Sequence, residues 1–171
     1  MNLKDAIRQV NNFPKEGILF YDITTLLKSA DYLNLAIDKM AEKIQNIDFD
    51  LVVCPESRGF IFGMPLAYKL KKGFVPARKP GKLPYKKVSK TYDLEYGSNS
   101  IELHADAIKP NQKVIIVDDL LATGGTCKTL AELIEDMGGK VAGIEFLIEL
   151  KNLGGRNFLS NYKNVLSVIE Y

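Results

Sequence analysis

Residues 114–126, VIIVDDLLATGGT, carry the strongest signal in the chain. Four β-favouring apolar residues lead into two adjacent carboxylates, and a small Gly-rich turn follows before a helix-like segment near Thr126. This order predicts a buried strand that presents Asp118 and Asp119 at its carboxyl end, where parallel α/β sheets bind ligands. Main-chain N–H groups at a helix N-terminus attract anions. Carboxylates beside such a turn suit a ligand with hydroxyls and a phosphate, such as a ribose 5-phosphate.

Composition indicates an ordinary globular protein. The 171 residues are 46% hydrophobic and 26% charged, and we expect one domain over residues 1–171. The net charge of +2 argues against nucleic acid as the main partner. No apolar run approaches the roughly 18 residues of a membrane span, and the N-terminus lacks the apolar core of a signal peptide. Cys54 and Cys127 show no metal-ligand spacing, so we expect reduced thiols in a cytoplasmic protein without a membrane partner.

Hydrophobic periodicity predicts alternating strands and helices. We expect helices over residues 3–10, 31–44, 59–70 and 126–137, with a brief turn or helix over 24–28. We expect strands over residues 17–20, 50–54, 73–77, 100–103, 114–118, 141–150 and 165–169. This alternation favours an α/β fold with a mainly parallel central sheet flanked by helices.

Residues 78–97, RKPGKLPYKKVSKTYDLEYG, have neither a helical nor a strand period. A loop of this length in a compact domain is usually a lid, a binding loop or a disordered segment. Its five lysines make it strongly basic, and for Lys86, Lys87 and Lys90 we expect a solvated surface.

A second motif, CPESRGF at residues 54–60, follows a predicted strand and leads toward a helix. Sheet topology would place it at the same edge as Asp118. Arg58 could bind a diphosphate through its two-pronged guanidinium. An ordinary turn with a surface arginine explains this segment equally well.

Together these motifs resemble those of the type I phosphoribosyltransferases. The acidic pair followed by Thr-Gly-Gly-Thr is similar to the family's phosphoribosyl-diphosphate motif, and the Leu120-Leu121-Ala122 insert and ESRGF resemble its adenine-specific branch. The resemblance implies the type I phosphoribosyltransferase fold, with a small N-terminal hood over residues 1–30 and a flexible catalytic loop over 78–97. It also implies transfer of the 5-phosphoribosyl group from 5-phosphoribosyl 1-diphosphate to adenine, giving AMP and pyrophosphate in purine salvage. A homodimer is implied as well.

The resemblance assigns roles at the predicted sheet edge. Asp118 and Asp119 would accept hydrogen bonds from the ribose hydroxyls and stabilise an oxocarbenium-like ribose. Adjacent residues of a strand point to opposite faces, so both acids reach the ligand only if the strand has ended at Asp119. Ser57 and Arg58 would lie at the pyrophosphate. The 5′-phosphate would bind at Ala122, Thr123, Gly124, Gly125 and Thr126. Mg²⁺ would be held mainly by the diphosphate and water, with no dedicated protein ligands.

Two further segments would close the site. In residues 78–97, Arg78 and Lys82 would contact the diphosphate, while Glu95 and Tyr96 would reach the purine or the transition state, with Glu95 handling the purine proton. Residues 78–97 would act as a flap that closes over the site and excludes water from the ribosyl cation.

In FPKEGILFYDIT, residues 13–24, aromatic and apolar side chains would sandwich the base while the main chain reads its edge. Leu19 and Phe20 would supply the side chains, and the main-chain role would extend to Tyr21. Phe20 could equally be a plain core residue.

Two other functions stay open. Tyr21 stands where the adenine branch usually has a basic residue, which allows another purine such as hypoxanthine or xanthine. A non-catalytic, ligand-sensing regulator on the same fold is the other alternative, although about a dozen residues before FPKEGILF are too few for a winged helix.

Overall fold

The computed structural model describes residues 1–93 and 98–171. They form two compact units, Met1–Lys39 and Met40–Tyr171. The prediction of a single domain over residues 1–171 stays a prediction. No helix within the described residues is long and apolar enough to cross a lipid bilayer.

The N-terminal unit is built around a small hairpin. After the 3-10 helix η1 (Leu3–Ala6), strand β1 (Arg8–Asn11) pairs antiparallel with β2 (Leu19–Asp22). Helix α1 (Thr24–Leu27) and the start of α2 (Ala30–Ile44) follow. The predicted helix over residues 3–10 is therefore wrong in its second half, because Val10 pairs with Phe20 across the hairpin and cross-strand pairing overrides the local helical spacing.

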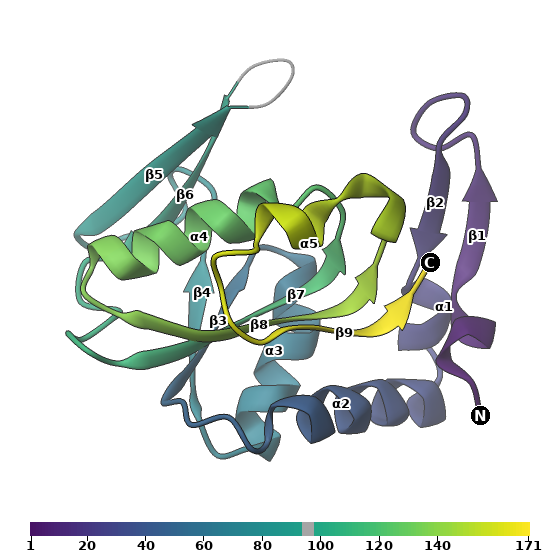
Figure 1. Cartoon of the computed structure of the whole chain (residues 1–171), viewed down its shortest axis with the longest axis horizontal. Coiled ribbons are helices and arrows are strands. Elements are labelled where there is room, and N and C mark those ends of the chain that lie inside the picture. Colours follow the sequence, from purple (N-terminus) through teal and green to yellow (C-terminus); the bar gives the residue numbers. More distant parts are fainter. Residues whose placement is uncertain (94–97) are drawn as a thin grey trace. The chain divides into compact units, whose positions relative to one another are not determined.

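The C-terminal unit contains the predicted parallel sheet, in the order β4-β3-β7-β8-β9. Its strands are β3 (Leu51–Pro55), β4 (Gly73–Ala77), β7 (Lys113–Leu121), β8 (Lys140–Glu149) and β9 (Val165–Glu170). Helix α3 (Arg58–Lys69) lies on one side of this sheet and α4 (Gly125–Asp136) on the other, and α5 (Gly155–Phe158) lies beside α4 (Figure 1). Helices on both faces explain why the strands read as continuous apolar runs.

Close helix–strand packing is visible at Gly63 in α3. A Cβ at this position would lie 2.0 Å from the Cys54 Sγ, so the helix can approach β3 only with glycine here. Cys54 and Cys127 are both buried free thiols, as the sequence predicted. The core on the α4 side is made of aliphatic residues from the sheet and from α4, including Val53, Ile116, Ile144, Leu130 and Ile134.

The segment 78–97 is not a loop throughout. Strand β5 (Lys87–Asp93) pairs antiparallel with β6 (Ser98–His104), and the hairpin projects from the sheet near α4 (Figure 1). Cross-strand partners stabilise β5, with Lys87 Nζ 3.0 Å from Glu102 and Lys90 Nζ 2.7 Å from Asp136 of α4. Such long-range partners are invisible to local periodicity, which is why the strand was missed. Of the three lysines expected to be solvated, only Lys86 lacks such a partner among the described contacts.

Candidate active site

The Gly-rich turn, residues 122–126, links the end of β7 to the start of α4. Gly124 adopts a left-handed conformation, with φ of 86°. The N–H of Lys128 donates to the Gly124 carbonyl at 2.9 Å, so the N–H groups of Gly125, Thr126 and Cys127 precede this helical hydrogen bond. A Cβ at Gly125 would meet no atom within 4 Å. The turn therefore offers main-chain donors and open space at the positive end of a 12-residue helix.

The acidic pair faces the same space. Asp118, Asp119 and the whole Gly-rich turn line a cavity of about 190 Å³, together with Arg58. The expectation that the strand must end at Asp119 is wrong, because β7 continues to Leu121. Both acids still line the cavity, and Asp118 Oδ1 accepts a hydrogen bond from the N–H of Asp119 at 2.8 Å.

Arg58 is the first residue of α3, and the structure brings it to the acidic pair. Its Nε lies 2.8 Å from Asp119 Oδ2. A Cβ at Gly59 would lie 3.1 Å from Asp118 Oδ1, so the helix N-terminus also approaches the second acid. Ser57 is exposed at the N-cap position of this helix, where its side chain makes no capping hydrogen bond, and the Glu56–Ser57 peptide bond is cis. The arginine of ESRGF is thus part of the cavity, whereas the Ser57 side chain is not among its lining groups.

Burial is the main cause of the pKa shifts of Asp118 and Asp119. Loss of hydration, with the Asp119 charge beside it, raises the pKa of Asp118 well above its usual range. Burial also raises the pKa of Asp119, although the Arg58 guanidinium opposes the shift. Asp119 is only 5% exposed, so it is a buried acid within β7. Hydrogen bonds from the hydroxyl groups of a ligand would stabilise the negative charge of this buried carboxylate.

A second cavity of about 230 Å³ adjoins the first, because Thr126 lines both. Arg78 lies here, with its Nε 3.0 Å from Glu56 Oε2, and the N–H of Lys79 donates to the other oxygen of Glu56. Burial acts against ionisation of Glu56, but these two hydrogen bonds and the nearby charge of Lys82 lower its pKa overall. Arg78 therefore pairs with a carboxylate that the sequence analysis did not single out, and the charge of Lys82 also acts on that carboxylate.

Tyr92 is the second residue that the sequence did not reveal. Its hydroxyl lies 3.2 Å from Thr126 Oγ1, so strand β5 contacts the Gly-rich turn directly. Only the three-dimensional pairing of the hairpin brings these residues together. Glu95 and Tyr96, for which the sequence predicted catalytic contacts, lie outside the described residues.

The predicted base-binding residues lie together on β2 in the N-terminal unit. Leu19 is 38% exposed, and Phe20 packs edge-on against Phe13 with ring centroids 5.0 Å apart. Phe20 is half-buried rather than a fully enclosed core residue. The strand therefore presents apolar and aromatic surface that is still accessible.

The magnesium ion stays a prediction, and the carboxylates of the first cavity are oxygen ligands of the type that Mg²⁺ takes. Within residues 1–93 and 98–171, no three His, Cys, Asp or Glu side chains cluster to hold a metal ion. Asp118 and Asp119 are the carboxylates of the first cavity, and Asp119 is paired with Arg58. Mg²⁺ prefers such sites, with few protein oxygens and several from phosphates and water.

Comparisons with known proteins agree with this geometry. Residues 22–169 match the phosphoribosyl transferase domain family. An adenine phosphoribosyltransferase of Caldicellulosiruptor bescii is 57% identical over 171 residues, covering 100% of this chain and 97% of that protein.

Solved structures give the same result. The adenine phosphoribosyltransferase of Thermoanaerobacter pseudethanolicus superposes with a TM-score of 0.95 at 51% identity, over 99% of this chain and 98% of that one. The enzyme of Saccharomyces cerevisiae, solved with an imino-altritol bisphosphate and adenine, gives 0.87 at 40% identity, over 96% and 94%. The relatives named above are adenine phosphoribosyltransferases, and the chain therefore belongs to the phosphoribosyltransferase family.

Proposed function

We propose that the protein transfers the 5-phosphoribosyl group from 5-phosphoribosyl 1-diphosphate to adenine, giving AMP and pyrophosphate in purine salvage. One observation carries the proposal: an acidic pair, of which Asp119 is buried and Asp118 half-buried, and a Gly-rich turn at a helix N-terminus line a single cavity. Relatives at 53–57% identity along the chain carry the same activity in their names.

The first cavity would bind the ribose 5-phosphate part of the substrate. The N–H groups of Gly125 and Thr126 and the Thr123 hydroxyl would donate to the 5′-phosphate. Asp119, helped by Asp118, would accept hydrogen bonds from the ribose hydroxyls. As the C1–O bond breaks, positive charge grows on the ribose ring, and the Asp119 carboxylate stabilises it in surroundings with little water.

The leaving diphosphate would lie between the two cavities. Arg58, Arg78 and Lys82 supply positive charge there, and Arg58 would exchange its contact with Asp119 for one with diphosphate oxygens. Bound Mg²⁺ would neutralise part of the diphosphate charge and so make it a better leaving group.

The resemblance to the family assigns base recognition to two segments, residues 13–24 and 78–97. We assign stacking on adenine to Leu19 and Phe20 and main-chain recognition to the strand at Tyr21. Glu95 and Tyr96 would reach the purine or the transition state, with Glu95 handling the purine proton. Supporting this, Leu19 and Phe20 remain partly exposed on one short strand.

We also propose that the protein is a cytoplasmic homodimer. Helix α3 presents an exposed apolar row, Ile61, Met64 and Tyr68, at the three- and four-residue spacing of one helix face. A second copy could cover this row with the same surface, as two-fold interfaces do. The buried reduced thiols of Cys54 and Cys127 fit a reducing compartment.

A panel of bases tests the proposal. Adenine, hypoxanthine and xanthine would each be supplied with 5-phosphoribosyl 1-diphosphate and Mg²⁺, and nucleotide formation would be measured. We expect turnover of adenine far above the other two. Faster turnover of hypoxanthine would overturn the base assignment, and no turnover of any base would favour the ligand-sensing regulator.

A further inference from the structure

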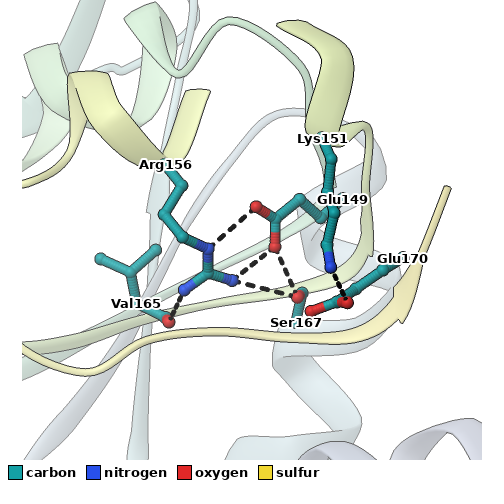
Figure 2. A network of polar contacts seen from close by, with 6 residues as sticks. All are labelled: Glu149, Lys151, Arg156, Val165, Ser167 and Glu170. Carbon is teal, nitrogen blue, oxygen red and sulfur yellow. Dashed lines mark hydrogen bonds and ion pairs between the residues drawn. The ribbon is translucent and has the colours of Figure 1, made fainter. Parts of the chain in front are cut away.

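An ion-pair cluster lies next to the Gly-rich turn, and the proposed mechanism assigns no role to its residues. It consists of Glu149 at the end of β8, Arg156 in α5 and Ser167 in β9 (Figure 2). Arg156 Nε donates to Glu149 Oε1 at 2.9 Å, while its Nη2 pairs with Oε2 of the same carboxylate. Ser167 donates to Glu149 at 2.7 Å, and Arg156 Nη1 donates to the Val165 carbonyl. Arg156 thus ties α5 to the last two strands of the sheet.

The residue before Arg156 touches the Gly-rich turn through bare backbone. A Cβ at Gly155 would lie 2.3 Å from the Ala122 carbonyl oxygen and 2.7 Å from Leu121 Cδ1. In the opposite direction, a Cβ at Gly124 would lie 3.0 Å from the Gly155 carbonyl oxygen. No side chain separates the two turns, so a shift of Gly155 is transmitted to residues 122–124.

The cluster is too well satisfied to be an incidental surface pair. Glu149 has a side chain only 3% exposed, and the hydrogen bonds from Arg156 and Ser167 lower its pKa despite burial. The guanidinium meets the carboxylate through two nitrogens, an arrangement that fixes orientation as well as charge. By contrast, the neighbouring pair Lys151–Glu170 is exposed on both sides and makes one contact (Figure 2).

We propose that Arg156 is a positioning residue for the 5′-phosphate: anchored by Glu149 and Ser167, it holds Gly155 against the Gly-rich turn and fixes that turn's donors. This inference rests on the proposed function, because it requires the turn to bind the phosphate. Arg156 itself touches no substrate group. Its loss should weaken binding of the phosphate end selectively, since small displacements of positioned donors are costly.

The test uses the intact protein and four variants. Arg156→Lys keeps the charge but loses the paired geometry, Ser167→Ala removes one anchor, and Gly155→Ala adds a methyl group against Ala122. Lys151→Met is the matched control from the same region. For each protein, kcat, both KM values, the thermal midpoint and the Kd of ribose 5-phosphate without adenine would be measured.

We expect Arg156→Lys and Gly155→Ala to raise the KM for 5-phosphoribosyl 1-diphosphate and the Kd of ribose 5-phosphate about tenfold. Ser167→Ala should give a smaller rise in the same direction, and the KM for adenine and the Lys151→Met control should stay near wild type. Variants that lose thermal stability but bind ribose 5-phosphate like wild type would overturn the positioning role alone. Wild-type protein that binds ribose 5-phosphate but turns over no base would overturn only the proposed reaction, and failure to bind it would overturn both.

Discussion

Two arginine–carboxylate pairs at the same end of the sheet behave differently. In Arg58–Asp119 and Arg156–Glu149 the acid is almost fully buried, at 8% and 3% side-chain exposure, and the arginine is 48% and 43% exposed. Yet the pKa of Asp119 is raised by burial, whereas the pKa of Glu149 is lowered by its hydrogen bonds with Arg156 and Ser167.

The difference lies in the balance between burial and hydrogen bonding: burial has the larger effect on the pKa of Asp119, whereas the hydrogen bond with Arg156 has the larger effect on the pKa of Glu149. Glu149 receives two guanidinium nitrogens and a hydroxyl, so its burial is compensated. Asp119 receives one guanidinium nitrogen and borders a cavity that can admit a ligand. An incompletely satisfied buried charge is typical of a functional site, and a saturated one is typical of a structural support.

The largest expected effect is a loss of activity when the charge of Asp119 is removed. For Asp119→Asn we expect turnover to fall about 10²- to 10³-fold, because the growing ribose charge loses its counter-charge. The free energy of unfolding should change by less than about 1 kcal/mol, since burial already disfavours this charge. Steady-state kinetics and urea denaturation measure the two effects, with the exposed Asp48→Asn as control. A variant that unfolds but keeps its rate per folded molecule would contradict this assignment.

Breaking the second pair should cost stability, in addition to the loss of phosphate affinity expected above. Arg156→Met leaves the Glu149 charge without its main partner, and we expect the free energy of unfolding to fall by about 2 kcal/mol. This is below the range for fully buried pairs, because Arg156 is 43% exposed. The double variant Glu149→Gln with Arg156→Met removes the stranded charge and should recover much of the loss in urea denaturation. Equal losses in the single and double variants would show that packing, not charge, is responsible.

Glu145 extends the comparison to a buried carboxyl without any arginine. It lies four residues before Glu149 on β8, is fully buried, and neither of its oxygens has a hydrogen-bond partner among the described residues. Burial raises its pKa from 4.5 to about 9. The folded state therefore takes up a proton, so this group's contribution is complete below pH 4.5 and is lost as pH rises toward 9.

The measurable consequence is that folding stability depends on pH. Between pH 5 and 8, folding stability should fall by up to about 1.4 kcal/mol per pH unit because of Glu145, and Glu145→Gln should flatten that slope. Glu149 has the opposite sign, because its lowered pKa gives stability that is lost as pH falls through the folded value. Urea denaturation across this pH range, with the exposed Glu16→Gln as control, measures the difference. An unchanged slope in Glu145→Gln would contradict the buried protonated state.

The smallest effect is expected at the contact between strand β5 and the Gly-rich turn. Tyr92→Phe removes one hydrogen bond to Thr126, and we expect the KM for 5-phosphoribosyl 1-diphosphate to rise about threefold, or roughly 0.6 kcal/mol. Tyr85→Phe, at an exposed tyrosine of the same segment, should behave like wild type. Equal kinetic changes in both variants would indicate a general effect of the segment rather than this contact.

The sequence predicted most of this sheet because buried parallel strands are long apolar runs. Residues 73–77 were predicted with the observed bounds, and the helix over 31–44 begins one residue earlier than predicted. Strand β5 was missed because its stability comes from pairing with β6 and from contacts with α4. At the site, the motifs identified Arg58, Asp119 and the Gly-rich turn, which the structure brings to one cavity. Glu56 and Tyr92 were missed because each contacts a partner that is distant in sequence, and Arg156 was missed because its partners Glu149 and Ser167 come from two different strands.

A crystal structure of the protein with AMP would test the main claim most directly. We predict that the 5′-phosphate lies within hydrogen-bond distance of the main-chain N–H groups of the Gly-rich turn, with a ribose hydroxyl on Asp119. An AMP molecule bound elsewhere, with the turn and the acidic pair making no contact to it, would contradict the account.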